Sequence, residues 1–280
     1  MNIRGGYMNR VLIHHNIKSD SMLVKKQLTE LLESRGKTLV TEDPEVIIVI
    51  GGDGTMLSAI RKYKHLRKPF VGIDTGTLGF LTTIMPDNLE KIFDVLDSKN
   101  YRINSYPLLM VNSKTLSGDV YTEFAFNEIT IKHVEPKLME AKVYLNSKPF
   151  NYFTGDGLIV STPMGATGYA IWAGGAVVHS DIPVYQITPL TPNDNSVNRP
   201  MSSTMIVPIH TVLDINIVKA HKRKVIVACD GIKLSNEYIE DLHIKVADDL
   251  TIDVIRSDEF DYFDLFKRKI IDKNIRRVLE

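Results

Sequence analysis

The chain has 280 residues, of which 34 are Lys or Arg and 34 are Asp or Glu, so its formal net charge is zero. This length allows one large domain or two modest domains with hydrophobic cores. The balanced charge disfavours a nucleic-acid-binding protein, which normally carries a basic excess, but it allows a small charged ligand at one local site. The single cysteine, Cys229, cannot form an internal disulfide, so we expect a cytoplasmic protein. No apolar stretch is long enough for a membrane span or a signal peptide, and we expect no membrane partner.

The first hundred residues alternate between strand and helix patterns. Apolar runs predict strands over 10–16, 45–50 and 68–74, and helical spacing follows each strand over 19–36, 55–66 and 86–100. In the first helix the residues expected on the buried face are Met22, Leu23, Leu28, Leu31 and Leu32. The alternation predicts an α/β fold with a doubly wound parallel sheet.

The pattern changes near residue 105. Short β-rich segments dominate up to about residue 255, which predicts a second, mainly antiparallel domain. The tail over 260–280 has helical spacing, and its apolar residues need a surface to pack on. We therefore expect an α/β domain over 1–104, with 256–280 packed back on it, and a β-rich domain over 105–255.

A glycine-rich segment, GGDGT at 51–55, follows the second buried strand. A strand-to-helix turn directs main-chain N–H groups and the positive end of a helix to one place, which suits phosphate. Gly51, Gly52, Gly54 and the N–H groups around Thr55 are therefore candidate phosphate-binding groups. The charge of Asp53 would repel phosphate, so its carboxylate makes more sense as the proton acceptor for a hydroxyl that attacks a phosphoryl group.

The alternative for Asp53 is a tight turn in which the carboxylate caps a helix that begins near Thr55. A second glycine turn, DTGTLGF at 74–80, follows the next buried strand and favours the functional interpretation. Parallel sheets bind ligands at the carboxyl ends of their strands, where both turns would lie. The sequence contains neither a Walker A motif nor a G-x-G-x-x-G motif that opens a helix.

Six motifs, in this order, resemble the NAD kinases: GGDGTML at 51–57, TGTLGFL at 75–81, FNEITI at 126–131, TGDGLIVSTPMGATGYAIWAGGAVVH at 154–179, ITPLTPNDNSVNRP at 187–200 and VACDG at 227–231. The resemblance implies a two-domain enzyme that phosphorylates the adenosine ribose 2′-hydroxyl of NAD to give NADP. It implies ATP, or another phosphate donor such as polyphosphate, with a divalent ion such as Mg²⁺ that arrives with the donor. It also implies a homo-oligomer, either a dimer or a tetramer.

The resemblance also assigns roles to residues. Asp53 takes the position of the general base, and no dedicated metal ligands are implied. The implied substrate-binding residues are Gly54, Asn127, Glu128, Asp156, Thr167, Gly168, Tyr169 and Thr191. The implied pocket-lining residues are Leu57, Thr77, Phe80, Met164, Trp172 and Asn195. Asp230 and Gly231 match a late turn near the phosphates.

Each of these assignments has a structural alternative. Asn127 and Glu128 together are also consistent with a simple step between two strands, and Asp156 with a β-turn before glycine. Tyr169 is also consistent with a core aromatic residue, and Asp230 with the turn of a hairpin.

Four positions depart from the family pattern. Met164 stands where Ser or Thr is common, Trp172 where a small residue is common, Thr154 where some relatives have Arg, and Thr77 where some have His. Trp172 is the only tryptophan, and it either lies against the ligand or packs in the core.

Two other functions compete with an NAD kinase. The first is another kinase with a related glycine-aspartate turn, such as a lipid kinase, although the balanced charge does not favour a membrane-facing surface. The second is a module that binds NAD without turnover, although binding alone would not need a carboxylate at position 53. The eight histidines show no zinc-binding spacing.

Overall fold

A computed structural model describes residues 7–76, 79–97, 101–194, 199–256 and 261–272. The chain divides into two compact units, here called unit 1 (Met1–Tyr106 with Leu250–Glu280) and unit 2 (Pro107–Asp249). The divisions fall close to residues 104 and 255, where the sequence patterns change. Each unit is described by itself.

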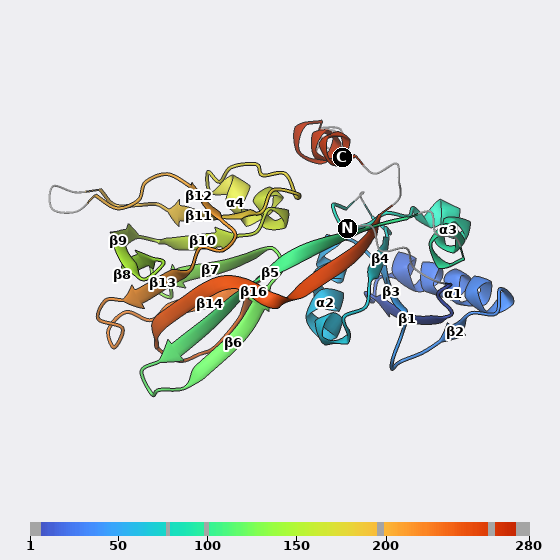
Figure 1. The fold of residues 1–280 in the computed structure, drawn as a ribbon, viewed down its shortest axis with the longest axis horizontal. Coiled ribbons are helices and arrows are strands. Elements are labelled where there is room, and N and C mark those ends of the chain that lie inside the picture. Colours follow the sequence, from blue (N-terminus) through green and yellow to red (C-terminus); the bar gives the residue numbers. More distant parts are fainter. Residues whose placement is uncertain (1–6, 77–78, 98–100, 195–198, 257–260, 273–280) are drawn as a thin grey trace. The chain divides into compact units, whose positions relative to one another are not determined.

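Unit 1 contains a parallel sheet (Figure 1). Its strand order is β2 (Thr38–Leu39), β1 (Arg10–His15), β3 (Val46–Ile50) and β4 (Phe70–Ile73), and all three pairings are parallel. The described α-helices of the sheet region are α1 (Ser19–Ser34), α2 (Asp53–Tyr63) and α3 (Ile92–Leu96). Strand β3 is buried along its whole length, as its continuous apolar run predicts for a strand covered on both faces.

Helix α1 buries a different face from the expected one. Val24, Leu28 and Leu32 are buried, whereas Met22 and Leu23 are 47% and 58% exposed. The expectation for Met22 and Leu23 was therefore wrong. The two residues lie one and two positions before Val24, and at 100° per residue they point away from the stripe that starts there.

The third predicted helix, over 86–100, is shorter and less regular than expected. A 3₁₀ segment, Pro86–Lys91, comes first, and Asn88 within it has non-helical dihedral angles (φ −137°, ψ 55°). Only Ile92–Leu96 is α-helical. Four of its five residues are packed into the core of unit 1, so tertiary burial rather than helix length stabilises this segment.

Unit 2 is built from antiparallel strands. One sheet has the order β12 (Met205–Pro208), β11 (Val184–Leu190), β10 (Gly157–Ser161), β7 (Glu128–His133), β14 (Val225–Cys229) and β15 (Ile232–Lys233). A second sheet includes β16 (Ile239–Arg256), β13 (Leu213–Ile217), β8 (Met139–Leu145) and β9 (Lys148–Gly155), with β5 (Arg102–Thr115) beside β16 and β6 (Val120–Ala125) beside β5. The prediction of a mainly antiparallel second part is confirmed.

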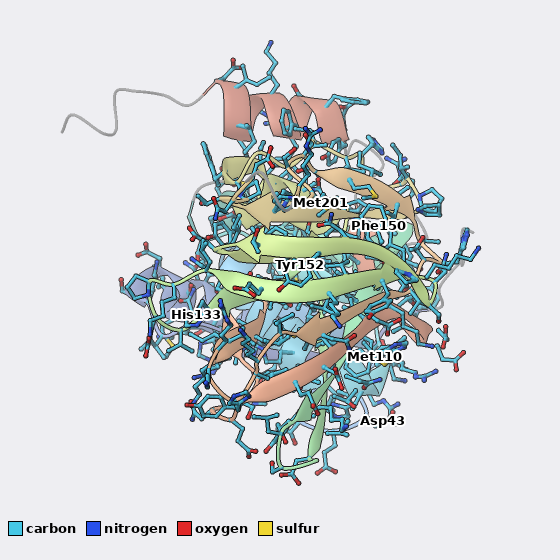
Figure 2. The ribbon with its side chains drawn as sticks, turned by 90° about the vertical axis from the view of Figure 1, so that its left-hand side faces the viewer. Asp43, Met110, His133, Phe150, Tyr152 and Met201 are labelled. Atoms are coloured by element: carbon cyan, nitrogen blue, oxygen red, sulfur yellow. The ribbon has the colours of Figure 1, made fainter. Side chains whose placement is uncertain are left out.

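The core of unit 2 combines side chains from both sheets. Phe153 on β9, Val160 on β10 and Ile215 on β13 are all fully buried in one cluster. The outward side of β9 carries Phe150 and Tyr152, which are 44% and 38% exposed (Figure 2). Alternating burial of this kind is what a sheet with one covered face requires.

The tail contains a short helical segment, here called the C-terminal segment (residues 261–272). Asp261 caps its first helix, α5 (Tyr262–Phe266), by accepting a hydrogen bond from the N–H of Asp264 at 2.8 Å. A π-helical turn over Lys267–Ile271 follows. The predicted helix over 273–280 lies outside the described residues. None of the described helices is long and apolar enough to span a membrane.

Candidate functional site

The GGDGT turn connects β3 to α2 through Gly51 and Gly52. Gly51 has a φ of 150°, and a Cβ atom there would lie 2.3 Å from Oγ1 of Thr55. Asn16 donates a hydrogen bond to the same Oγ1 at 3.1 Å, which keeps Thr55 in place. The close approach therefore requires glycine at position 51, since any other side chain would displace Thr55.

Asp53 is the first residue of α2, and its side chain does not cap that helix. Its carboxylate accepts hydrogen bonds from the main-chain N–H groups of Phe80 (Oδ2, 3.0 Å) and Leu81 (Oδ1, 2.9 Å). The capping alternative is therefore wrong, and the carboxylate is directed to the second glycine turn. The Asp53 side chain is 32% exposed, so a ligand has access to it.

The second glycine turn is organised by another carboxylate, that of Asp74. It accepts hydrogen bonds from the N–H groups of Gly76 (2.7 Å) and Gly79 (2.6 Å) and from the hydroxyl of Thr82 (2.7 Å). A Cβ atom at Gly79 would lie 2.4 Å from Oδ1 of Asp53. The two turns thus meet at the carboxyl ends of β3 and β4, where a parallel sheet binds its ligands.

Lys269, in the C-terminal segment, also contacts Asp53. Its Nζ donates a hydrogen bond to Oδ2 of Asp53 at 3.1 Å and lies 5.1 Å from the ring centroid of Phe80. The sequence analysis missed this residue, because a lysine in a basic helical tail carries no signal of a long-range ion pair. Leu57, on α2, is half-buried, and Thr77 lies outside the described residues.

In unit 2, Asp230 supports the segment that contains the Asn-Glu pair. Its carboxylate accepts hydrogen bonds from the N–H groups of Phe126 (2.8 Å), Asn127 (2.7 Å) and Glu128 (3.2 Å). Asp230 and Gly231 both have positive φ, 47° and 77°, in the turn between β14 and β15. Asp230 therefore forms the hairpin turn and also holds the start of β7.

The segment after β10 packs closely on the same residues. The hydroxyl of Thr162 donates to the carbonyl oxygen of Phe126 at 2.7 Å, and its N–H donates to that of Asn127 at 2.9 Å. A Cβ atom at Gly165 would lie 2.2 Å from the carbonyl oxygen of Asn127. Close packing here requires glycine at position 165, which explains one glycine of the long 154–179 motif.

Glu128 has an unusual environment. Burial raises the pKa of its carboxyl group to about 7, with a further contribution from the negative charge of Asp230. Its Oε2 atom is buried and has no hydrogen-bond partner among the described residues. The same atom would lie 3.2 Å from a Cβ atom at Gly168. A buried acceptor without a partner is suited to a ligand hydroxyl.

Asp156 lies away from this cluster within the unit. The register pairs Ser161 with Glu128 at one end of β10 and Gly157 with Lys132 at the other. Asp156 precedes Gly157, so it is separated from Glu128 by more than about 13 Å of strand. The structure therefore does not bring Asp156 together with the Asn-Glu pair in unit 2.

Thr191 lies near Asp156 rather than near the Asn-Glu pair. It follows β11, has a φ of 43° and is exposed. Next to it, the buried Thr154 donates a hydrogen bond to the carbonyl oxygen of Asn193 at 3.0 Å. Thr154 thus has a structural role in this chain. The predicted pocket residue Asn195 lies outside the described residues.

Two short helices follow Thr162: a 3₁₀ turn, Met164–Thr167, and α4 (Tyr169–Trp172). The hydroxyl of Thr167 donates to the carbonyl oxygen of Met164 at 3.4 Å. Met164 is buried, whereas Tyr169 and Trp172 are 39% and 69% exposed. The alternatives that placed Tyr169 and Trp172 in the core are therefore wrong for this chain.

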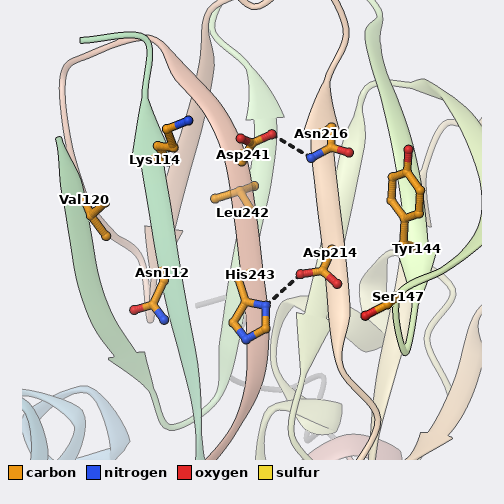
Figure 3. Close-up of a pocket in the computed structure, with 10 residues that line it drawn as sticks. All are labelled: Asn112, Lys114, Val120, Tyr144, Ser147, Asp214, Asn216, Asp241, Leu242 and His243. Atoms are coloured by element: carbon orange, nitrogen blue, oxygen red, sulfur yellow. Dashed lines mark hydrogen bonds and ion pairs between the residues drawn. The ribbon is translucent and has the colours of Figure 1, made fainter. Parts of the chain in front are cut away.

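Two surface hollows of unit 2 lie elsewhere. One, of about 450 Å³, is lined by residues of the second sheet (Figure 3). Across it, Nδ1 of His243 and Oδ1 of Asp214 are 2.7 Å apart, and the amide of Asn216 donates to Asp241 at 2.6 Å. The other, of about 330 Å³, lies beside Phe150 on β9. Neither hollow is lined by a predicted site residue.

Within the described ranges, no group of three or more His, Cys, Asp or Glu side chains is placed to hold a metal ion. The carboxylate of Asp74 accepts three hydrogen bonds inside its own turn, and that of Asp230 accepts three from the chain before β7. A divalent ion that phosphates bring with them needs only one or two protein carboxylates, and these residues fit that mode better than a protein-only cage.

Comparison with known proteins gives consistent results. Residues 8–101 match the ATP-NAD kinase N-terminal domain and residues 126–250 the ATP-NAD kinase C-terminal domain. The chain is 34% identical to the NAD kinase of Lactobacillus johnsonii over 261 residues, which are 92% of this chain and 95% of that protein. It is 35% identical to the NAD kinase of Enterococcus faecalis over 243 residues, 86% of this chain and 91% of the relative.

Solved structures share the fold. Yeast NADH kinase complexed with NADH has a TM-score of 0.82 at 17% identity, covering 96% of this chain and 89% of the yeast chain. An NAD kinase from Archaeoglobus fulgidus in complex with ATP has a TM-score of 0.69 at 22% identity, covering 89% of this chain and 94% of the archaeal chain. These likenesses confirm the predicted fold class.

Proposed function

The chain belongs to the NAD kinase family and phosphorylates NAD to NADP, and we propose that Asp53 is the general base of this reaction. The observation that carries the proposal is the geometry of its carboxylate. Two main-chain N–H groups of the second glycine turn hold it, it does not cap its own helix, and it remains 32% exposed. A fixed, accessible carboxylate beside a glycine-rich helix start suits proton abstraction next to a phosphate group.

The acceptor is proposed to be the adenosine ribose 2′-hydroxyl, and the donor ATP. Asp53 takes the proton of the hydroxyl, whose oxygen forms a bond to the γ-phosphorus while the bond from that phosphorus to the bridging β-γ oxygen breaks. ADP leaves with the electron pair. The N–H groups of Gly52, Gly54 and Thr55 at the start of α2 are proposed to bind donor phosphate oxygens. A divalent ion such as Mg²⁺, bound with the donor, neutralises charge on the phosphates.

In unit 2, Asn127 and Glu128 are proposed to bind hydroxyl and amide groups of the dinucleotide. The support is the unpartnered Oε2 of Glu128 and the three hydrogen bonds by which Asp230 holds this segment. Gly168, Thr167 and Tyr169 follow in the segment that packs on Asn127 and are proposed to contact the same ligand. For Asp156 and Thr191 we propose dinucleotide contacts only from the resemblance, since they lie at the other end of β10.

The test is direct. Purified protein incubated with NAD, ATP and Mg²⁺ should produce NADP, and EDTA should abolish the reaction. Polyphosphate in place of ATP tests the donor, and NADH in place of NAD tests the acceptor. Phosphorylation of diacylglycerol or sphingosine without NADP formation would favour the lipid kinase, and tight NAD binding without turnover would favour the sensing module.

Assembly and location remain predictions from the sequence. We propose a homo-oligomer, a dimer or a tetramer, in the cytoplasm. Light scattering coupled to size-exclusion chromatography checks the assembly, and a monomer at micromolar concentration would contradict it.

A further inference from the structure

The C-terminal segment is held against the second glycine turn by apolar packing. Tyr262 and Leu265 are 8% and 3% exposed, and the rings of Tyr262 and Phe80 lie 6.5 Å apart between centroids. The N-cap bond of Asp261 fixes the start of α5. The position of Lys269 therefore follows from packing of its own segment and does not depend only on the ion pair that it makes.

Lys269 is the exchangeable partner of the Asp53 carboxylate. Oδ1 accepts from the N–H of Leu81, and Oδ2 accepts from the N–H of Phe80 and from Nζ of Lys269. The two N–H groups belong to a turn that cannot leave without refolding, whereas an ammonium on a flexible four-carbon side chain can turn away. A hydroxyl that donates to Oδ2 would take the place that Nζ now occupies.

The chemistry of the site requires a cation at this position. A general base beside a triphosphate brings two anionic groups close together, and their repulsion opposes binding and catalysis. The Lys269 side chain is only 21% exposed, so its charge is less screened than that of a surface lysine. An ammonium has three N–H donors, so one group can contact the carboxylate and a phosphoryl oxygen together.

We propose that Lys269 is a further catalytic residue, which pairs with Asp53 before substrates bind and then binds the oxygens of the transferred phosphoryl group. This inference rests on the proposed function. During transfer Asp53 accepts the hydroxyl proton, the acceptor oxygen bonds to the γ-phosphorus, and ADP leaves with the electron pair of the broken bond. Lys269 stays protonated throughout and stabilises the charge on the equatorial oxygens.

The simpler alternative is that the ion pair only anchors the C-terminal segment. Four variants separate the two roles: Lys269→Met, Lys269→Gln, Lys269→Arg and Arg268→Met. Gln keeps a hydrogen-bond donor for Asp53 but lacks the charge, and Arg keeps the charge. Arg268 lies on the same helical turn and pairs with Asp264 at 3.0 Å, away from Asp53, so it is a matched control for loss of one positive charge.

Each variant is assayed for kcat and for KM of ATP and NAD, and its melting temperature is measured. We expect Lys269→Met and Lys269→Gln to lose about 10²-fold in kcat, a typical loss for one transition-state donor. Lys269→Arg should recover at least a tenth of the wild-type kcat. The KM of NAD should change less than threefold, and Arg268→Met should match the wild type.

Three results would overturn the role of Lys269. Lys269→Gln with near wild-type kcat would show that the charge is not used. Lys269→Met with a lowered melting temperature but unchanged kcat would assign Lys269 to anchoring. A faster Lys269→Met enzyme would show that the pair inhibits Asp53. Failure of the proposed function is separate, because wild-type protein would then make no NADP from NAD and ATP.

Discussion

At the scale of the residue, the contacts of Asp53 predict the effect of its amide. Asp53→Asn can accept with one oxygen only, and its NH₂ group would face a main-chain N–H of Phe80 or Leu81. We expect a loss of stability of about 1 kcal/mol and a fall in kcat of about 10²–10⁴-fold, the usual value of a general base. NAD titrations and thermal melts check that binding and fold persist. Near-normal turnover in the variant would reject the assigned role.

Glu128 predicts a trade between stability and ligand binding. Its pKa is raised from 4.5 to about 7, mainly by burial, so its stabilising contribution is complete below pH 4.5 and is lost as the pH rises to 7. Glu128→Gln removes this loss and should increase the free energy of unfolding at pH 8 by at most about 3 kcal/mol. At pH 4.5 the two proteins should be equally stable. NAD affinity should fall in the variant.

Glu45 provides the opposite sign as a control. The N–H groups of Arg10 and Asn9 lower the pKa of its carboxyl group, so it stabilises the fold above its unfolded pKa and the effect disappears as the pH falls. Glu45→Gln should destabilise the protein at pH 8, with little effect at acid pH. Urea unfolding at pH 4.5 and 8 measures both variants. Equal shifts at the two pH values would refute the assignment for either residue.

Trp172 predicts a change in fluorescence without a change in stability. Because it is 69% exposed, Trp172→Ala should alter the free energy of unfolding by no more than about 0.5 kcal/mol. If its ring lies against the base, NAD should change its emission, and the variant should lose about 0.5–1.5 kcal/mol of NAD affinity. Phe150→Ala removes an exposed aromatic outside the proposed site and serves as the control. Emission that stays constant under saturating NAD would remove Trp172 from the site.

At the scale of the element, the second glycine turn is the part whose shape matters most. It lies against Asp53 from one side while Asp74 holds it from the other, so its glycines are not equivalent. At Gly79 a Cβ atom would lie 2.4 Å from Asp53 and 2.8 Å from Thr82, whereas at Gly76 the nearest atom would be 3.7 Å away. A small shift of the carboxylate is enough to misalign a general base.

Alanine at these two positions is therefore a matched pair. We expect Gly79→Ala to displace the Asp53 side chain and to lower kcat by about 10²-fold, as misplacement of about 1 Å does in other active sites. Gly76→Ala should keep kcat within about twofold, since its methyl group makes only ordinary contacts. Steady-state assays and melting curves of both variants test this. Equal activity in the two variants would show that Asp53 is not positioned by Gly79.

At the scale of the whole molecule, the two cores are linked by strands that they share. Strand β5 contributes Leu109 to the core of unit 2 and Ile103 to that of unit 1, and β16 contributes Ile244 and Ile255 in the same way. Loss of either core would leave apolar residues of these strands without partners. The two units should therefore unfold together, although their cores are separate.

A cavity in one core tests this coupling. Leu28 is fully buried on α1 in unit 1, and Leu28→Ala should lower the free energy of unfolding by about 2–5 kcal/mol. Calorimetry should show one transition, shifted as a whole to lower temperature. Leu31→Ala, at a partly buried position of the same helix, should shift it less. Two resolved transitions, with only one of them moved, would contradict the coupling.

The sequence alone determined the features that depend on neighbours in the chain. Alternating apolar runs predicted the parallel sheet, and the glycine turns with Asp53 were recognisable because each lies within a few residues. Periodicity failed at Met22 and Leu23, because the buried face of α1 depends on what packs against it. Asp156 belongs to a motif that is continuous in sequence but spans the length of β10, so its two ends lie apart.

Only the tertiary structure decided which distant groups meet. The carboxylate of Asp230 reaches Phe126 across 104 positions, and Lys269 reaches Asp53 across 216. Local patterns carry no information on such pairs, because the path of the chain brings them together and neither side chain alters its own local conformation. The charge next to the general base is therefore a property of the fold, since the packing of Tyr262 against Phe80 places Lys269 there.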